Sequence, residues 1–372
     1  MARWAPVRRL PLLLLLLTLH LHAASRWKLQ YFYDQDRSAL EIRDLQCPSS
    51  QHCVAAGVMF EKDHSKGVAL VTSDGGRHWS LVELKERPAA LFFLNDSRGW
   101  MATNDGIWRT DESGRSWTKL HKLESILALY FLDAMHGYAA GYPKAIYETD
   151  DGGKTWRKVD AAEQASSIKE QTVYDWIAFD GPQNGFILGY AGRPRNERAP
   201  DWLDPARAQF RRQAPRTTIS IVTRDGGKNW KASTGQSLAE LTRLKVGPKG
   251  SALGLWEYQP SEEFPTEVYH VNLDTYMKTN VYRQSDRIVT DVAYFPDGEA
   301  FIAAVEPPGK LKDAPIPGKL KILRSSSLNL WLEMAVDYRA VAQRAILAGP
   351  DARNLWVATD TGMILKLVDE QR

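Results

Sequence analysis

An eight-residue pattern that occurs four times constrains the fold of this chain more than any other feature. Residues 149–156 read Thr-Asp-Asp-Gly-Gly-Lys-Thr-Trp, and residues 72–79 and 223–230 repeat the Thr, Asp, Gly and Trp at the same spacing. Residues 110–117 form a looser copy, in which Glu112 stands where the other copies carry Asp. A repeat at fixed spacing indicates a repeat architecture, and this decides the fold class before any local assignment is made.

Each copy of the pattern is predicted to be a turn between two strands, because short apolar segments precede and follow it. The acidic residue can accept hydrogen bonds from the backbone N–H groups of its own turn, and the glycine can supply a positive φ where the chain reverses. The tryptophan can pack over the turn at the start of the next strand. The residues assigned to these structural turns are Asp74, Gly76, Trp79, Glu112, Gly114, Trp117, Asp151, Gly153, Trp156, Asp225, Gly227 and Trp230.

The full repeat is longer than the turn. Trp79, Trp117 and Trp156 are spaced by about 40 residues, and each interval holds four short apolar segments, which is typical of a β-propeller blade. We therefore predict an all-β fold, a seven-bladed β-propeller of four-stranded antiparallel blades. The expected blades cover residues 39–85, 86–122, 123–160, 173–235, 236–284, 286–336 and 344–367, with a linker or short helix over 161–171.

The last blade lacks a fourth strand at the end of the chain. Residues 27–32, Trp-Lys-Leu-Gln-Tyr-Phe, have the same form as the segments that begin at Trp117 and Trp156. We expect this N-terminal strand to join the C-terminal blade as its outer strand, which would close the ring with both ends of the chain and leave few open edges.

The first 24 residues are predicted to be a signal peptide rather than part of the fold. Arg3, Arg8 and Arg9 precede an apolar run over residues 10–21, and small residues follow it. The alternative is an uncleaved membrane anchor. Cleavage would leave one domain over residues 25–372, in the periplasm or secreted, and we expect it to be a monomer. The leader holds three of the 48 basic residues and none of the 45 acidic residues, so the remainder is neutral, which argues against a nucleic-acid partner.

Cys47 and Cys53 are the two cysteines of the chain. An even count at close spacing in an exported protein favours a disulfide, here across the turn between the first two strands of the first blade. Two buried thiols are the alternative. The histidines show no metal-ligand spacing and no Gly-rich phosphate loop opens a helix, so the sequence indicates no metal site and no cofactor.

The repeated turns match the Asp-box, or BNR, repeat in the form Thr-x-Asp-x-Gly-x-x-Trp. Together with the Gly-Tyr-Ala-Ala-Gly segment at 137–141 and the Ile-Tyr-Glu-Thr segment at 146–149, they make the chain resemble the photosystem II assembly/stability factor family, which includes bacterial relatives. The resemblance implies an exported seven-bladed propeller that acts as a protein-binding scaffold. The same repeat occurs more distantly in sialidase-type propellers and in two-domain xyloglucanases.

The acidic residues of the turns do not predict catalysis, because they are distributed one per blade and cannot converge on one substrate. A sialidase would need an arginine cluster, a Tyr–Glu pair and a Phe/Tyr-Arg-Ile-Pro element near the start, and residues 39–45 contain no such element. We therefore expect a non-catalytic protein that binds another envelope or secreted protein. The alternative is a sialidase-like glycoside hydrolase or a glycan-binding propeller.

Long insertions fall between the second and third strands of blades four, five and six, at residues 191–216, 257–265 and 306–319, and blade one has a smaller one at residues 60–66. Because the repeated turns join the third and fourth strands, these insertions must cluster on the opposite rim. Arginine with aromatic residues is typical of interfaces, so we predict a binding face there; tolerated insertions and an active site are the alternatives. The candidate binding residues are Arg193, Arg195, Arg198, Trp202, Arg207, Phe210, Arg211, Arg212, Trp256 and Tyr258.

Overall fold

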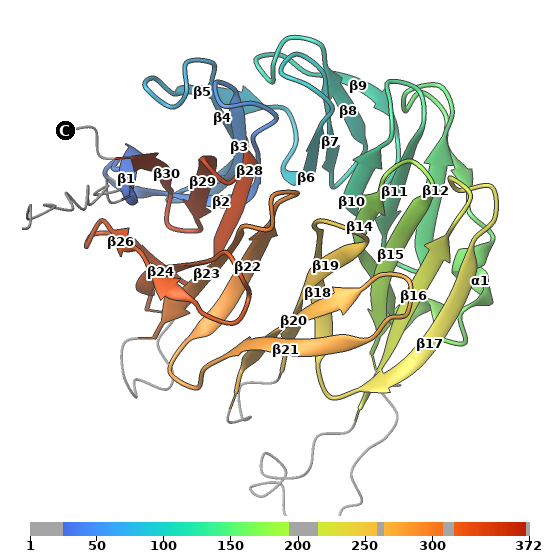
Figure 1. Ribbon diagram of the computed structural model, residues 1–372. Coiled ribbons are helices and arrows are strands. Elements are labelled where there is room, and N and C mark those ends of the chain that lie inside the picture. The colour runs from blue at the N-terminus through green and yellow to red at the C-terminus, as the bar shows by residue number, and fades with distance from the viewer. Residues whose placement is uncertain (1–24, 193–214, 259–263, 308–315, 370–372) are drawn as a thin grey trace, which may run out of the picture.

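The computed structural model describes residues 25–192, 215–258, 264–307 and 316–369. In these ranges seven antiparallel sheets follow one another around a ring (Figure 1), so the predicted seven-bladed β-propeller is confirmed. The leader predicted over residues 1–24 lies outside the described residues. Within the described part of the chain, no helix is long and apolar enough to cross a membrane.

Blades one to three follow the predicted boundaries and are built from consecutive strands. Blade one contains β2 (Ser38–Gln46), β3 (Cys53–Glu61), β4 (His64–Thr72) and β5 (Ser80–Leu84). Blade two contains β6 (Pro88–Phe93), β7 (Gly99–Thr103), β8 (Ile107–Thr110) and β9 (Thr118–His121), and blade three contains β10 (Ile126–Phe131), β11 (Gly137–Gly141), β12 (Ala145–Thr149) and β13 (Arg157–Lys158). The short helix α1 (Ala161–Gln164) and the 3-10 turn η1 (Lys169–Gln171) occupy the predicted linker.

Blades four to six carry the long insertions. Blade four contains β14 (Thr172–Asp180), β15 (Asn184–Ala191), β16 (Arg216–Thr223) and β17 (Lys231–Ser237), and blade five contains β18 (Glu240–Val246), β19 (Ser251–Glu257), β20 (Thr266–Asn272) and β21 (Lys278–Arg283). Blade six contains β22 (Ile288–Tyr294), β23 (Ala300–Glu306), β24 (Gly318–Ser325) and β25 (Leu332–Glu333), with the short β27 (Val341–Ala342) paired to β24. In every blade the first strand lies nearest the centre of the ring (Figure 1).

Blade seven is closed by the N-terminus, as predicted. It contains β28 (Ala345–Asp351), β29 (Asn354–Thr359) and β30 (Met363–Asp369), and β1 (Ser25–Phe32) pairs antiparallel with β30 from Ser25–Asp369 to Phe32–Met363. The two strands lie together in Figure 1, although they come from opposite ends of the chain. This pairing ties both termini of the described fold into one sheet.

Two of the predicted boundaries are wrong. Residues 335–336 were assigned to blade six, but β26 (Ala335–Val336) pairs in parallel with Arg26 and Trp27 of β1 and so belongs to blade seven. It covers part of the outer edge of β1, which would otherwise be unpaired. Residues 60–66 were predicted to be a small insertion, yet β3 and β4 continue through them and pair up to Glu61 and His64.

The disulfide prediction is confirmed, because Cys47 and Cys53 are bonded to each other across the turn between β2 and β3. Cys53 is fully buried and Cys47 nearly so. Both belong to an apolar cluster that also holds Trp356 of blade seven. The bond therefore lies at the junction between the first and last blades.

The repeated turns join the third and fourth strands of blades one to four, on what we call the box rim. In blade three, Asp151 Oδ1 accepts the backbone N–H groups of Lys154 and Thr155, each at 2.9 Å, and the Thr149 hydroxyl at the same distance. Trp156, directly before β13, donates its indole N–H to the Gly153 carbonyl at 3.1 Å. Positive φ angles between 80° and 93° occur at Gly76, Gly114, Gly153 and Gly227.

The turns also connect neighbouring blades. The turns of blades one, three and four contain two consecutive glycines. In each, the carbonyl oxygen of the first glycine accepts a hydrogen bond from a side chain of the preceding blade. The donors are Lys366 Nζ to Gly75 at 2.9 Å, Trp100 Nε1 to Gly152 at 2.9 Å and Tyr138 Oη to Gly226 at 3.3 Å. The repeated pattern therefore fixes the register between blades as well as the turn within each blade.

Replacing Asp151 with alanine is expected to lower the free energy of unfolding by about 1–2 kcal/mol at pH 7, because two backbone N–H groups lose a charged acceptor. The hydrogen bonds, that of the Thr155 hydroxyl first, lower the pKa of Asp151 to about 2. The stabilisation is therefore present above the ordinary aspartate pKa and lost as the pH falls toward 2. Urea unfolding at pH 7 and pH 3 measures both effects. Asp150→Ala, which removes only surface ion pairs with Arg157 and His136, should cost less than about 1 kcal/mol.

Candidate functional site

The first strands of all seven blades lie around the centre of the ring (Figure 1). They line a central channel with a cavity of about 700 Å³. Its wall carries both hydrophobic and charged side chains. The charged residues of the wall are Arg43, Asp44, Asp175, Arg243, Lys245, Asp291 and Arg344. Four of these seven belong to blades four to six, the blades that carry the long insertions.

A β-bulge within the first strand shapes the wall in blades one to six. In four blades the side chain of the residue after the bulge forms a hydrogen bond or an ion pair with the next blade. Asp44 Oδ2 accepts the Leu91 N–H at 2.6 Å, and Asp291 Oδ2 accepts the Leu347 N–H at 2.8 Å. Trp176 donates to the Leu244 carbonyl at 3.0 Å, and Arg243 Nε lies 3.7 Å from Asp291 Oδ1. These four polar side chains of the channel wall thus connect neighbouring blades.

Asp175 differs from the other two channel aspartates. It is the bulged residue of β14 itself, and its carboxylate accepts no hydrogen bond from the neighbouring blade in the described structure. Burial raises the pKa of Asp175 to about 6, while Arg243 lowers it and Glu257 raises it further. Arg243 also stacks over the Trp176 ring at 4.9 Å. Blades four and five therefore place an acid, a guanidinium and an indole together on the channel wall.

Asp175→Asn is expected to stabilise the protein in a pH-dependent way. The folded-state pKa of about 6 lies above the ordinary value of 3.8, so the folded chain binds the proton more tightly and its stability falls as the pH rises from 4 to 6. Asparagine does not ionise and so avoids this loss. The free energy of unfolding of the variant minus that of the wild type should therefore be about 2–3 kcal/mol larger at pH 7.5 than at pH 4. Thermal or urea unfolding at both pH values measures it. An equal effect at the two pH values would contradict the assignment.

A second group of polar and aromatic side chains lies on blade five, at the rim opposite the box rim. Trp256 is the penultimate residue of β19, and Glu267 is the second residue of the neighbouring β20. The Tyr258 and Tyr269 hydroxyls donate to Glu267 Oε2 at 2.6 and 2.7 Å. Lys278 Nζ lies 4.4 Å from the Trp256 ring centroid and 4.5 Å from that of Tyr269. We call Trp256, Tyr258, Glu267 and Tyr269 the blade-five cage.

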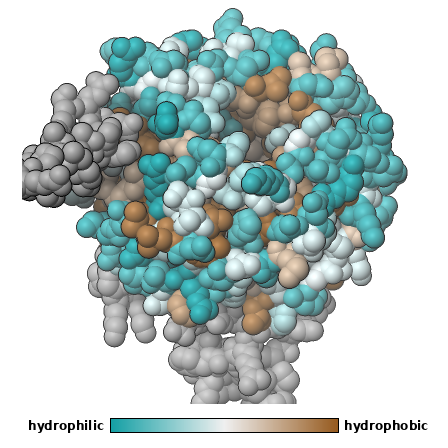
Figure 2. Space-filling model, viewed as in Figure 1, coloured by the Kyte–Doolittle hydropathy of each residue, from teal (hydrophilic) through white to brown (hydrophobic). Residues whose placement is uncertain are grey.

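The structure brings together only part of the predicted binding face. Trp256 and Tyr258 lie in the blade-five cage, on the rim predicted for binding. The other candidates, Arg193, Arg195, Arg198, Trp202, Arg207, Phe210, Arg211 and Arg212, lie outside the described residues. The face visible in Figure 2 is mostly hydrophilic, with apolar residues in separate patches.

Sequence reasoning missed Asp175, Arg243 and Glu267. A signal existed for the first, since an aspartate interrupts the apolar segment 173–179 that forms β14. For Glu267 there was no such signal, because its importance depends on tyrosines that reach it from the same strand and from beyond the end of β19.

The lining of the channel as described holds three aspartates, and Glu257 lies close enough to Asp175 to raise its pKa. Asp44, Asp175 and Asp291 belong to blades one, four and six, so no two of them are on adjacent blades. Among the described residues, no group of three or more His, Cys, Asp or Glu side chains could hold a metal ion. Arg43, the channel arginine of blade one, donates to Glu41 at 3.0 Å, and Arg243 pairs with Asp291 in blade six.

No protein-family model matches the chain, and no curated protein matches it. Its fold is similar to that of solved propellers. The structure of YCF48 bound to D1 peptide matches with a TM-score of 0.60 at 16% identity, covering 94% of this chain and 98% of that one. YCF48 from Cyanidioschyzon merolae matches with a TM-score of 0.57 at 14% identity, covering 92% and 98%.

Enzymes share the fold as well. A xyloglucanase from Xanthomonas campestris matches with a TM-score of 0.50 at 12% identity, covering 87% of this chain and 59% of the enzyme. The resemblance predicted from the repeated turns is thus found among the solved structures, where the chain resembles YCF48 in fold. At these identities the likeness shows the fold and not the activity.

Proposed function

We propose that this chain is an exported, non-catalytic propeller that binds a segment of another envelope or secreted protein. The binding surface is the rim of blades four to six opposite the box rim. The observation that carries the proposal is the blade-five cage, in which aromatic rings and a buried carboxylate lie at the rim of a rigid scaffold. Partly exposed aromatic side chains beside charged groups are typical of protein-binding surfaces.

The comparison with YCF48 bound to D1 peptide supports the choice of a peptide segment as ligand, because that protein shares the fold over nearly the whole of both chains. The channel chemistry supports a non-catalytic role in part, since two of its three aspartates, Asp44 and Asp291, are engaged by backbone N–H groups of the next blade.

A capture experiment tests the proposal. A tagged protein with residues 25–372 would be incubated with the envelope and secreted fractions of its host. Overlapping synthetic peptides that cover the sequence of each captured protein would then be tested for direct binding. The variant Trp256→Ala/Tyr258→Ala should recover at least tenfold less partner, and a variant lacking residues 195–213 tests the predicted loop. Equal recovery by all three proteins would contradict the proposed surface. Ser80→Ala, on the exposed outer strand of blade one, is the control.

Export is supported by the leader-type residues 1–24 and by the disulfide between Cys47 and Cys53, since disulfides persist in oxidising compartments. Mass spectrometry of the protein from the host gives its first residue. A mature N-terminus near residue 25 in the periplasm or medium is expected, whereas an intact residue 1 in the membrane fraction would establish the anchor instead.

A glycan is the second candidate ligand, because the similar xyloglucanase has this fold and the channel cavity of about 700 Å³ is of the size of small-molecule sites. Release of dye from a fluorogenic sialoside, or of sugars from xyloglucan oligosaccharides, would contradict the non-catalytic role. We expect neither.

A further inference from the structure

We infer that the blade-five cage is a binding site for the guanidinium group of an arginine side chain, and that Lys278 occupies this site in the free protein. The inference rests on the proposed function, because it names the side chain by which a partner segment would be recognised. It identifies the ligand by its charge and shape.

The shape of the cage comes from two rings. The centroids of Trp256 and Tyr269 are 4.9 Å apart and their planes meet at 71°, so the rings form a corner. Lys278 Nζ lies in that corner, within 4.5 Å of both centroids. Gly254, directly across from Tyr269 on β19, keeps the corner open, since a Cβ there would lie 2.4 Å from Cζ3 of the Trp256 indole. A cation over two aromatic faces is held more strongly than over one.

The charge of the cage comes from Glu267, whose side chain is 9% exposed. Both tyrosine hydroxyls donate to the same oxygen, Oε2, and Arg283 Nη1 lies 3.6 Å from the other oxygen. The hydrogen bonds and the nearby guanidinium therefore fix the carboxylate in position. It directs a negative field toward the two rings at short range, where little water screens it.

The present occupant fits the cage poorly. Contact with the rings strips water from the Lys278 ammonium and lowers its pKa, and the attraction of Glu267 offsets only part of that effect. An ammonium is compact and strongly hydrated, whereas a guanidinium is planar, weakly hydrated and stacks on aromatic rings. Blade five places guanidinium groups over aromatic rings elsewhere, since Arg283 lies over Phe264 at 4.8 Å and Arg243 over Trp176 at 4.9 Å.

Lys278 is able to leave the cage. It is an exposed residue at the start of the outermost strand β21, and its flexible stem can turn toward solvent. An arginine from a partner could then stack on Trp256 and Tyr269. The lysine acts as a competing internal ligand, which lowers the affinity of the free protein for any single cation.

A small probe tests the site without a partner. Binding of Nα-acetyl-arginine amide would be followed through the indole N–H signals of the folded protein by NMR. Lys278→Ala should bind this arginine probe at least fivefold more tightly than the wild type does. The same variant should bind the neutral isostere Nα-acetyl-citrulline amide at least fivefold more weakly than the arginine probe. The matched control is Lys119→Ala, because Lys119 also sits over an indole, that of Trp108 at 5.6 Å, but over one ring only; it should bind no better than the wild type.

Three results would overturn the inference. They are equal affinity of wild type and Lys278→Ala, equal affinity for the arginine and citrulline probes, and undiminished binding after Trp256→Ala is added to Lys278→Ala. Unchanged melting of Lys278→Ala would show that the variant folds. Because the probe experiment requires no partner, its failure would leave the capture experiment to decide the proposed function separately.

Discussion

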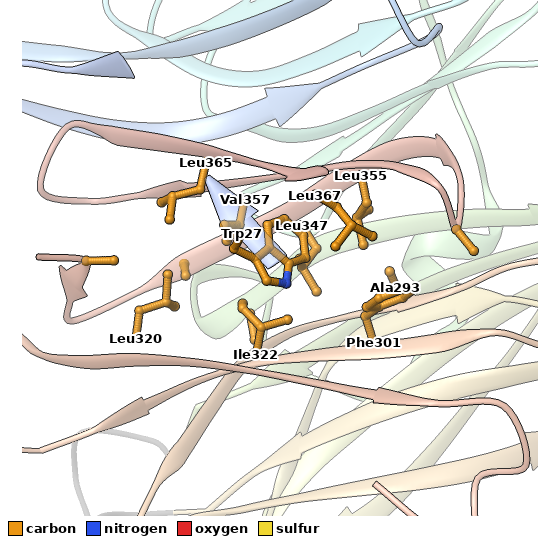
Figure 3. Close-up of a cluster of buried hydrophobic side chains, with 14 of the residues drawn as sticks. Trp27, Ala293, Phe301, Leu320, Ile322, Leu347, Leu355, Val357, Leu365 and Leu367 are labelled. Atoms are coloured by element: carbon orange, nitrogen blue, oxygen red, sulfur yellow. The ribbon is translucent and has the colours of Figure 1, made fainter. Parts of the chain in front are cut away.

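Replacing Trp27 with alanine is expected to lower the free energy of unfolding by about 3–5 kcal/mol, as for other buried aromatic residues. Trp27 is 2% exposed although it lies only two residues from the start of the described fold. Its indole packs between Leu365 and Leu367 of β30 and the blade-six residues Leu320 and Ile322 (Figure 3). The substitution would open a cavity between blades six and seven and weaken the strand that closes the ring.

Two variants separate packing from other effects. Trp27→Phe should cost about 1–2 kcal/mol, because the indole N–H has no acceptor among the described residues and only volume is lost. Lys28→Ala, on the exposed face of the same strand, should change stability by less than about 0.5 kcal/mol. Urea unfolding measures the stabilities, and trypsin cleavage after Arg26 and Lys28 reports opening of β1. A cost below 1 kcal/mol for Trp27→Ala would mean that the ring holds without this strand.

The fold was predictable because its signals are local. In residues 149–156, the acid, the glycines and the tryptophan each satisfy a need of one turn, so the turn can be identified without knowledge of its surroundings. Repetition then fixes the blade length, and residues 27–32 were placed in blade seven because they repeat the form of the strand after Trp117.

The wrong boundaries have the opposite origin. Ala335 and Val336 form a two-residue strand whose pairing with β1 is parallel and joins residues more than 300 positions apart. Nothing in two small apolar residues specifies such a partner. The pairing arises only once β1 presents an edge, which is a property of the closed ring.

The candidate site was only half predictable for a related reason. Trp256 and Tyr258 could be identified as aromatic residues in an insertion. Their function in the cage depends on Glu267, which lies across from Trp256 in the sheet. Cross-strand proximity is set by register, and the register of β19 against β20 was not available from periodicity alone.

Replacing Asp291 with alanine is the second change with a large expected effect, again about 3–5 kcal/mol of unfolding free energy. Asp291 is 1% exposed on the channel wall of blade six. Its Oδ1 accepts the Val292 N–H at 2.9 Å, and its Oδ2 accepts the Leu347 N–H of blade seven at 2.8 Å. Arg243 of blade five approaches Oδ1 at 3.7 Å. One carboxylate therefore joins three blades, and alanine would leave two backbone donors and a guanidinium without it.

Asp291→Asn should lose about half as much, because an amide oxygen can replace one acceptor but its NH2 group faces a donor. Asp297→Ala is the control in the same blade, since that exposed aspartate accepts only the Glu299 N–H of its own turn, and it should cost less than about 1 kcal/mol. A double-mutant cycle of Asp291→Asn with Arg243→Gln isolates their pairing by urea unfolding. If Asp291→Ala lowers the free energy of unfolding no more than Asp297→Ala does, the hydrogen bonds of Asp291 do not hold the blades together. Apolar packing around Leu347 and Phe301 would then alone set the register of blades six and seven, and the charged side chains of the channel would be free to bind a ligand.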